Sequence, residues 1–215
     1  MIAAVVFDMD GVIVDSEQVW DEVREQYVFE TGGTYTQSAT RDMMGMSSVE
    51  WSRYMADALG VPGTPAEINA AIVERMLARY GAAPPLIPGA VDAVLGCAER
   101  WPLAVASSSN PELIQVVLEA AGLHDVIPVV VSSQEVPRGK PSPDVYLEAA
   151  RRLGADPGDC VAVEDSHNGI RSAKAAGMRV VAIPNPHFPP DEEALAHADV
   201  VLRSIRELTA EVVEG

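Results

Sequence analysis

The stretch AAVVFDMDGVIVDSE, residues 3–17, places two aspartates at the end of an apolar run that has the composition of a buried strand. Asp8 and Asp10 are separated by one residue, and Gly11 follows at once. Mutual repulsion and the loss of hydration both oppose two carboxylates in such a position. Either the pair lies in a solvated turn, or a positive charge lies between the two groups.

The rest of the chain alternates between short apolar runs and helical stretches, which is the pattern of an α/β fold. The apolar runs lack strict polar–apolar alternation, as expected for parallel strands that are covered on both faces. Several of the helical stretches end in glycine, a common helix stop. We therefore expect a Rossmann-like parallel sheet core with helices on both faces. The predicted strands are 2–7, 103–108, 126–133, 160–165, 179–184 and 198–204.

Residues 16–83 break this alternation, because they contain no convincing strand. Three helices are predicted there, in SEQVWDEVREQYVFETGG, SSVEWSRYMADALG and PAEINAAIVERMLARYG, the second capped by serine and the third with proline in its first turn. We expect an α/β core of residues 1–15 and 84–215 with an all-helical cap, 16–83, inserted after the first strand. A role as a lid is a hypothesis, which hinges near 14–17 and 81–88 would support.

Composition and charge exclude several classes of protein. The chain of 215 residues has a net charge of −17, which disfavours nucleic acid or an anionic membrane as a partner. No apolar stretch is long enough to span a bilayer, and the first residues lack the basic region of a signal peptide. Cys97 and Cys160 show no motif spacing, so we interpret them as buried, reduced thiols of a cytoplasmic protein. We expect a monomer or a weak homo-oligomer.

Polar residues gather where the predicted strands end, and ligands of open parallel sheets bind at those carboxyl ends. The first strand ends in Asp8 and Asp10, the second in SSSN (107–110), and the fourth in EDS (164–166). Just beyond the third lies RGKPSPD with Lys140, one of only two lysines in the chain. An anionic ligand needs local positive charge in so acidic a protein, and Lys140 would supply it.

These side chains combine into the parts of a phosphoryl-transfer site. Asp8, Asp165 and Glu164 would offer an oxygen-rich nest for a hard divalent cation such as Mg²⁺, which would offset their repulsion. Ser107, together with backbone N–H groups that open the helix near Asn110, would form a phosphate seat. A cation and a phosphate seat at one sheet edge are the means by which proteins stabilise phosphoryl transfer.

Four stretches, FDMDGVIVDSE, VASSSN, GKPSPDVY and VAVEDSHNGI, resemble in order and spacing the signature motifs of the haloacid dehalogenase-like hydrolase superfamily. The resemblance covers nearly the whole chain, and it is closest to the branch of sugar phosphatases and β-phosphoglucomutases with a helical cap after the first strand. It implies a Mg²⁺-dependent phosphatase that hydrolyses a small phosphorylated metabolite through an aspartyl-phosphate intermediate.

The resemblance also implies roles for individual residues. Asp8 would be the nucleophile, and Asp10 the general acid and then the base. Ser107 would bind the phosphoryl oxygens, and Lys140 would pair with both the nucleophile and the phosphate. The metal ligands would be the Asp8 carboxylate, the backbone carbonyl of Asp10, Asp165, and Glu164 either directly or through water. The candidate substrate-binding residues are Gly11, Trp20, Gly45, Ser48, Ser108 and Asn110.

Other chemistries of the superfamily fit less well. Dehalogenases lack the second aspartate, here Asp10, and phosphonatases use a cap lysine, whereas residues 16–83 contain none. A β-phosphoglucomutase is the alternative, but the family implies a cap histidine and a cap arginine where Trp20 and Ser48 stand. We therefore expect a phosphatase, with a non-catalytic phosphate-binding protein as a third possibility. Trp20 is either an aromatic wall for the leaving group or a packing residue.

Overall fold

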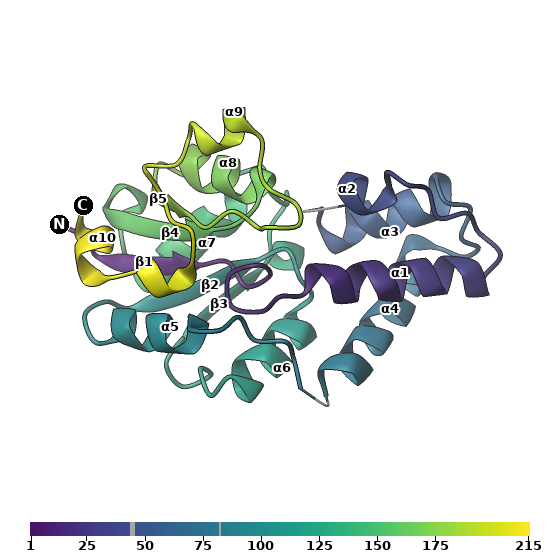
Figure 1. Ribbon diagram of the computed structural model, residues 1–215, viewed down its shortest axis with the longest axis horizontal. Helices are drawn as coiled ribbons and strands as arrows, with labels where there is room; N and C mark the ends of the chain where they lie inside the picture. The colour runs from purple at the N-terminus through teal and green to yellow at the C-terminus, as the bar shows by residue number, and fades with distance from the viewer. Residues whose placement is uncertain (44–45, 82) are drawn as a thin grey trace.

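A six-stranded parallel sheet forms the centre of the protein in the computed structural model, which describes residues 1–43, 46–81 and 83–215 (Figure 1). The strand order is β3-β2-β1-β4-β5-β6, and every neighbouring pair is parallel. Each strand lies inside a segment predicted from the sequence, which confirms the predicted α/β fold. The strands are β1 (Ala4–Phe7), β2 (Leu103–Ser107), β3 (Val129–Ser132), β4 (Cys160–Glu164), β5 (Arg179–Ala182) and β6 (Val200–Val201).

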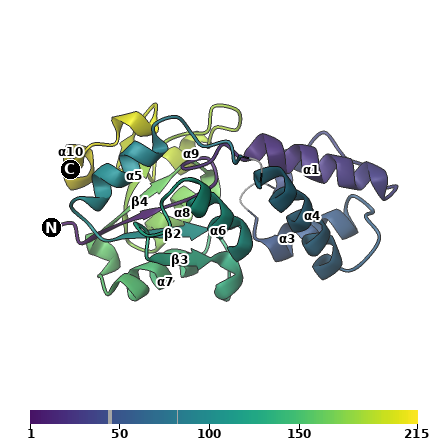
Figure 2. The ribbon, with the colours of Figure 1, turned by 90° about the horizontal axis from the view of Figure 1, so that it is seen from below.

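Helices cover both faces of the sheet (Figure 2). Successive residues of a strand point to opposite faces, so each strand contributes side chains to both sides of the sheet. The helical elements that follow residue 83 are α5 (Ala90–Ala98), α6 (Pro111–Ala120), η1 (Ser133–Glu135), α7 (Asp144–Leu153), η2 (Pro157–Asp159), α8 (His167–Ala175), α9 (Glu192–Leu195), η3 (Ile205–Glu207) and α10 (Ala210–Glu214). Val5 and Phe7 of β1 belong to an apolar cluster with residues of α5, α6 and α10. Ala4 and Val6 belong to a second cluster with residues of α7 and α8. The sheet is therefore buried on both sides, as its apolar runs predict.

A helical segment follows β1 and forms a separate group at one end of the sheet (Figures 1 and 2). Its helices are α1 (Glu17–Glu30), α2 (Ala39–Met43), α3 (Ser48–Asp57) and α4 (Pro65–Tyr80). Among the described residues between β1 and β2 there is no strand. The helices bury their apolar sides against one another. The fully buried large side chains of α3 and α4 are Trp51, Met55, Ile68, Ile72, Met76 and Tyr80.

Local sequence signals explain where these helices begin. Ser47 and Glu50 form a capping box at the start of α3, and Thr64 and Glu67 form another at the start of α4. Pro65 occupies the first turn of α4, where its missing N–H is tolerated. The short helix α2 is an addition to the three predicted helices. Its five residues, ATRDM, are too few to show an apolar period.

The two connections between the helical segment and the sheet lie side by side. Val14 forms isolated bridges with Leu86 and Asp10. The backbone N–H of Asp15 donates to the carbonyl of Pro85 at 2.8 Å, and the N–H of Ile87 donates to the carbonyl of residue 13 at 2.9 Å. The segments in which the sequence predicts hinges, 14–17 and 81–88, therefore meet in space.

The two cysteines and the character of the helices can be compared with what the sequence predicts. Cys97 and Cys160 are both buried and unpaired, as predicted. Burial raises the pKa of each thiol to about 11, so both are protonated at neutral pH. In the described parts of the chain, no helix has the length and apolar character that crossing a membrane requires.

The core of the helical segment makes a test of its packing possible. Ile72 of α4 is fully buried, whereas Glu74, two residues further on, is exposed. We expect Ile72→Ala to lower the free energy of unfolding by about 2–5 kcal/mol through lost apolar burial and a cavity. The control Glu74→Ala should change it by less than about 0.5 kcal/mol. Urea denaturation followed by circular dichroism measures both, and equal effects of the two substitutions would contradict the assigned packing.

Candidate active site

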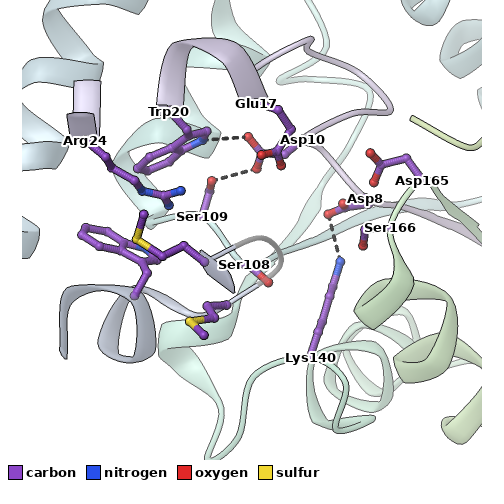
Figure 3. A pocket seen from close by; sticks show the side chains of 13 residues that line it. Asp8, Asp10, Glu17, Trp20, Arg24, Ser108, Ser109, Lys140, Asp165 and Ser166 are labelled. Atoms are coloured by element: carbon purple, nitrogen blue, oxygen red, sulfur yellow. Dashed lines mark hydrogen bonds and ion pairs between the residues drawn. The ribbon is translucent and has the colours of Figure 1, made fainter. Parts of the chain in front are cut away.

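The carboxyl ends of β1, β2 and β4 meet at the edge of the sheet that faces the helical segment (Figure 1), and Figure 3 shows the pocket that lies there. Asp8 follows β1 directly, and its backbone N–H donates to the carbonyl of Val163 in β4 at 2.9 Å. Phe7 pairs with Val163 in the register of the two strands, so the next residues, Asp8 and Glu164, become neighbours. The register of the sheet thus brings together two acids that lie 156 residues apart in the sequence.

A buried lysine connects these two acids. The Nζ of Lys140, in the loop between η1 and α7, lies 2.9 Å from Oδ1 of Asp8 and 2.6 Å from Oε1 of Glu164. Only 3% of Lys140 is exposed. Burial on its own lowers the pKa of Lys140, but the charges of Asp8 and Glu164 outweigh burial and the net shift is upward. The ammonium is therefore permanently charged and fixed between two carboxylates.

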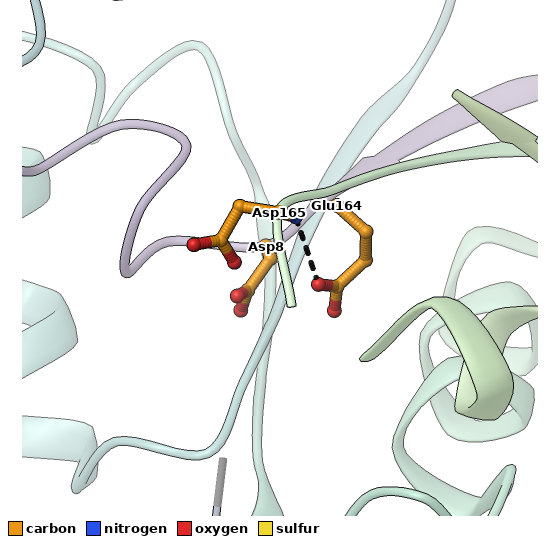
Figure 4. A group of neighbouring side chains, drawn as sticks. All are labelled: Asp8, Glu164 and Asp165. Atoms are coloured by element: carbon orange, nitrogen blue, oxygen red, sulfur yellow. Dashed lines mark hydrogen bonds between the residues drawn. The ribbon is translucent and has the colours of Figure 1, made fainter. Parts of the chain in front are cut away.

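Asp8, Glu164 and Asp165 form a buried group of acids (Figure 4). One carboxylate oxygen from each lies within 4.8 Å of the others. Burial raises the pKa of Asp8 and of Asp165 well above the ordinary value; Lys140 opposes the shift of Asp8 without cancelling it, and the charge of Glu164 adds to both shifts. One ammonium cannot neutralise three carboxylates, and all the donor atoms are oxygens. The group therefore suits a hard divalent cation.

Two glycines allow these acids to pack closely. Gly11 has a φ of +77°, and a Cβ atom there would come within 1.8 Å of Oδ2 of Asp165. A Cβ atom at Gly169, in the first turns of α8, would come within 1.9 Å of Oε1 of Glu164. A side chain at either position would collide with a carboxylate of the acid group. Gly11 therefore supports the acid group through its small size.

Asp10 lies apart from this group, and its carboxylate accepts four hydrogen bonds, of which Figure 3 shows those from Trp20 and Ser109. Oδ1 accepts from Oγ of Ser16 at 2.5 Å and from Nε1 of Trp20 at 3.3 Å. Oδ2 accepts from Oγ of Ser109 at 2.7 Å and from Oγ of Ser107 at 3.3 Å. Donors from both the sheet and the entry to the helical segment fix the orientation of this side chain.

The predicted phosphate seat lies where β2 ends and α6 begins. Ser107 is fully buried, and its Oγ also accepts the backbone N–H of Ser109 at 3.0 Å. Ser108 and Ser109 line the pocket above the acids, whereas Ser107 and Asn110 are not among the described residues that do so. Asn110 donates from Nδ2 to Oδ1 of Asn69 in α4 at 3.3 Å. Asn110 thus contacts the helical segment.

The remaining predicted residues differ in where they lie. Trp20 is buried and lines the pocket, and it packs at a tilt against Trp51 with ring centroids 5.9 Å apart. Ser48 is buried outside the described pocket lining, and its Oγ accepts a hydrogen bond from Nε2 of Gln134 at 2.7 Å. Gly45 lies outside the described residues.

Several pocket residues were not predicted as site residues. Glu17 and Arg24 line the pocket together with Trp20. The spacing of these three residues, i, i+3 and i+7, places them on one face of α1, so helical periodicity could have found them once Trp20 was chosen. Ser109 belongs to the predicted SSSN motif, but nothing in the sequence separates its role from that of its neighbours. The described lining also includes Met43, Met46, Trp51 and Ser166.

Comparisons with known proteins agree with this geometry. The family model of haloacid dehalogenase-like hydrolases matches residues 2–177. Hexitol phosphatase B from Escherichia coli K12 is 34% identical over 218 residues, which cover 100% of this chain and 97% of that protein. The crystal structure of CbbY from Rhodobacter sphaeroides in complex with phosphate superimposes with a TM-score of 0.87 at 29% identity, covering 100% of both chains.

A third comparison concerns the fold alone. β-Phosphoglucomutase (pgmB) from Clostridium difficile has a TM-score of 0.84 at 20% identity, and the match covers 100% of this chain and 96% of that one. The family match spans most of the chain, and the fold and the relatives agree with it. The chain therefore belongs to the haloacid dehalogenase-like hydrolases, as an enzyme of the phosphatase class.

Proposed function

We propose that the protein is a Mg²⁺-dependent phosphatase that hydrolyses a small phosphomonoester through a phosphoaspartate at Asp8. The observation that carries the proposal is the Lys140 ammonium, buried 2.9 Å from Asp8 and 2.6 Å from Glu164 beside a pocket that also contains Asp10. The likeness to hexitol phosphatase B supports a small phosphorylated metabolite, such as a sugar or polyol phosphate, as the substrate.

In the first step, a carboxylate oxygen of Asp8 attacks phosphorus and the bond between phosphorus and the leaving-group oxygen breaks. Asp10 donates a proton to that oxygen, so that the product leaves as an alcohol. We assign the binding of phosphoryl oxygens to Ser108, which lines the pocket, together with the N–H groups that open α6. Lys140 balances negative charge at the nucleophile and the phosphoryl group.

In the second step, water attacks phosphorus and the bond to the Asp8 oxygen breaks. Asp10, which lost its proton in the first step, accepts a proton from that water. The four hydrogen bonds to its carboxylate hold Asp10 in one orientation for both transfers. Two of those donors, Ser16 and Trp20, lie at the entry to the helical segment, so the position of that segment affects the orientation of the general acid.

The acid group fits Mg²⁺, because it presents buried oxygen donors with too little positive charge nearby. Asp8 and Asp165 would hold the ion, with the backbone carbonyl of Asp10. When bound, Mg²⁺ neutralises negative charge on the carboxylates and the phosphoryl oxygens. Both oxygens of Glu164 already accept hydrogen bonds, including those from Lys140 and from the backbone N–H of Asp165, which favours contact through water.

We assign residues 1–15 and 84–215 to the catalytic core and 16–83 to a cap. The paired connections between the two parts support this division, since Asp15 bonds to Pro85 just outside the helices. The cap contributes Glu17, Trp20 and Arg24 to the pocket and so would decide which leaving groups fit.

A β-phosphoglucomutase activity has less support from the pocket. Trp20 stands where the mutases are expected to have histidine, and its indole N–H is used by Asp10. Ser48, at the expected position of an arginine, is bonded to Gln134 and lies outside the described pocket lining.

Asp8→Asn should reduce phosphate release from a panel of sugar and polyol phosphates to background, because the amide cannot attack phosphorus. EDTA should do the same to the wild-type enzyme, and added Mg²⁺ should restore it. The control Asp125→Asn changes an exposed aspartate and should keep wild-type rates. A malachite green assay measures the release. Interconversion of glucose phosphates without any release would contradict the phosphatase proposal and favour the mutase.

Asp10→Asn should lower kcat by about 10²–10⁴-fold at saturating substrate, because general acid–base catalysis contributes that much. The substrate should still bind, since the phosphate seat and Lys140 are unchanged. Steady-state kinetics with the best substrate of the panel measure kcat. A kcat within threefold of the wild-type value would exclude Asp10 as the general acid.

Mg²⁺ should raise the melting temperature more at pH 8 than at pH 5. Burial raises the pKa of Asp8 and Asp165 in the folded metal-free protein, so the folded state binds more protons than the unfolded state. The stability from these groups is full below about pH 4 and is lost as the pH rises through their folded-state pKa. Mg²⁺ compensates the ionised carboxylates and restores that stability.

With Mg²⁺ at 100 times its Kd, the expected increase at pH 8 is about 5–10 °C by differential scanning fluorimetry. Asp165→Asn should lose most of this increase. The same increase at both pH values in the wild-type protein would show that the ion does not bind these acids.

A further inference from the structure

Arg24 is a buried charge that forms no ion pair with the described residues, although the charge of Glu17 acts on it from nearby. It lies in α1, and only 7% of the residue is exposed. No residue in the described part of the chain forms an ion pair with it or accepts a hydrogen bond from it, and its Nε is fully buried without a partner. The guanidinium instead lies over the rings of Trp20 and Trp51, 4.6 and 5.0 Å from their centroids.

Packing alone does not account for this arrangement. Stacking on aromatic rings offsets only a small part of the cost of removing a charge from water. Burial lowers the pKa of the Arg24 guanidinium, and the nearby charge of Glu17 opposes that shift only in part. Arg75 of α4, by contrast, lies partly in solvent and forms an ion pair with Glu30 at 2.9 Å. The Arg24 guanidinium is therefore buried without an anion paired to it among the described residues.

The pocket makes clear where that anion would lie. Of the described residues that line it, Lys140 and Arg24 are the cationic ones, and Lys140 is already paired with Asp8 and Glu164. Trp20 donates to the general acid Asp10 and carries Arg24 on its ring, so the guanidinium lies on the leaving-group side of the reaction (Figure 3).

We propose that Arg24 is the specificity-determining residue of this active site and that it binds a second anionic group on the leaving group of the substrate. That group is a carboxylate or a second phosphoryl group, both of which match the planar fork of a guanidinium. The inference rests on the proposed phosphatase function. It narrows the proposed sugar and polyol phosphates to those that carry a second anionic group, such as a phosphorylated sugar acid or a bisphosphate.

Glu17 is compatible with an anion at this place, although it lines the same pocket. Burial, with a smaller contribution from Asp10, raises the pKa of Glu17 to about 7. In its protonated form, the carboxyl can donate a hydrogen bond to the same anionic group.

Matched substrates test the proposal with the Mg²⁺-loaded enzyme. 3-Phosphoglycerate and glycerol 3-phosphate share a three-carbon skeleton and differ by a carboxylate in place of a hydroxymethyl group. Glycerol 1,3-bisphosphate adds a second phosphoryl group to the same skeleton. We expect kcat/KM for at least one of the charged probes to exceed that for glycerol 3-phosphate tenfold or more, and the better probe identifies the anion.

Arg24→Met should lower kcat/KM for the charged probe at least tenfold, mainly through KM, and bring its ratio to glycerol 3-phosphate close to one. Arg24→Lys should restore part of that ratio, which a loss of packing alone would not explain. The control Arg53→Met removes an exposed arginine of α3 and should keep the wild-type ratio. The melting temperature of Arg24→Met should not fall, because an unpaired buried charge is lost.

Two outcomes would overturn the inference while the phosphatase function stands. One is equal kcat/KM for charged and neutral probes in the wild-type enzyme. The other is an Arg24→Met variant that loses activity equally on both, together with a lower melting temperature. Calorimetric titration of the probes into Asp8→Asn gives a readout without turnover. If no probe is hydrolysed but Asp8→Asn binds the charged ones and Asp8→Asn/Arg24→Met does not, the proposed function fails and the anion site stands.

Discussion

The buried Lys140 ammonium, 2.9 Å from Asp8 and 2.6 Å from Glu164, is the interaction on which the rest of the site depends. The parallel pairing of β1 with β4 places the two acids side by side. Without the ammonium they would be uncompensated buried charges, which cost several kcal/mol each. Tyr146 of α7 contributes a further hydrogen bond to Glu164 at 2.6 Å. The sheet, the loop with Lys140 and α7 therefore build one arrangement, which presents Asp8 to the pocket.

The fold and the acid group could be predicted from the sequence, because both follow from short-range patterns and one topological rule. Apolar runs located every strand, and parallel strands place their carboxyl ends at one edge, which brought together Asp8, Lys140 and Asp165. Gly11 was also predicted from the sequence, as a substrate-binding residue. Its steric reason, the 1.8 Å that would separate a Cβ atom there from Oδ2 of Asp165, follows only from the packed structure.

The residues of the pocket wall were harder to predict from the sequence. Which face of α1 turns toward the sheet depends on how the helical segment packs, so Glu17 and Arg24 resembled ordinary surface charges in the sequence. The three serines at the end of β2 and just after it are alike in sequence, yet Ser107 is fully buried while Ser108 and Ser109 line the pocket. Ser48 was expected in the substrate site, but its hydrogen bond runs to Gln134. Packing between distant segments decides each of these cases.

Charge connects the two ends of the pocket. At the sheet edge, buried acids exceed the single ammonium, and a divalent cation would balance them. At α1, the Arg24 guanidinium forms no ion pair with a carboxylate of the described residues, although Glu17 lines the same pocket. Trp20 lies between these regions, bonded to Asp10 and stacked under Arg24. Recognition of the leaving group and orientation of the general acid therefore share one side chain.

The most direct measurement is an anomalous difference map from crystals grown with Mn²⁺, which takes the place of Mg²⁺ in oxygen-ligand sites. The account predicts one strong peak in contact with the carboxylates of Asp8 and Asp165, with the Lys140 ammonium still between Asp8 and Glu164. A map without a peak at these acids, or a Lys140 side chain turned into solvent, would contradict it.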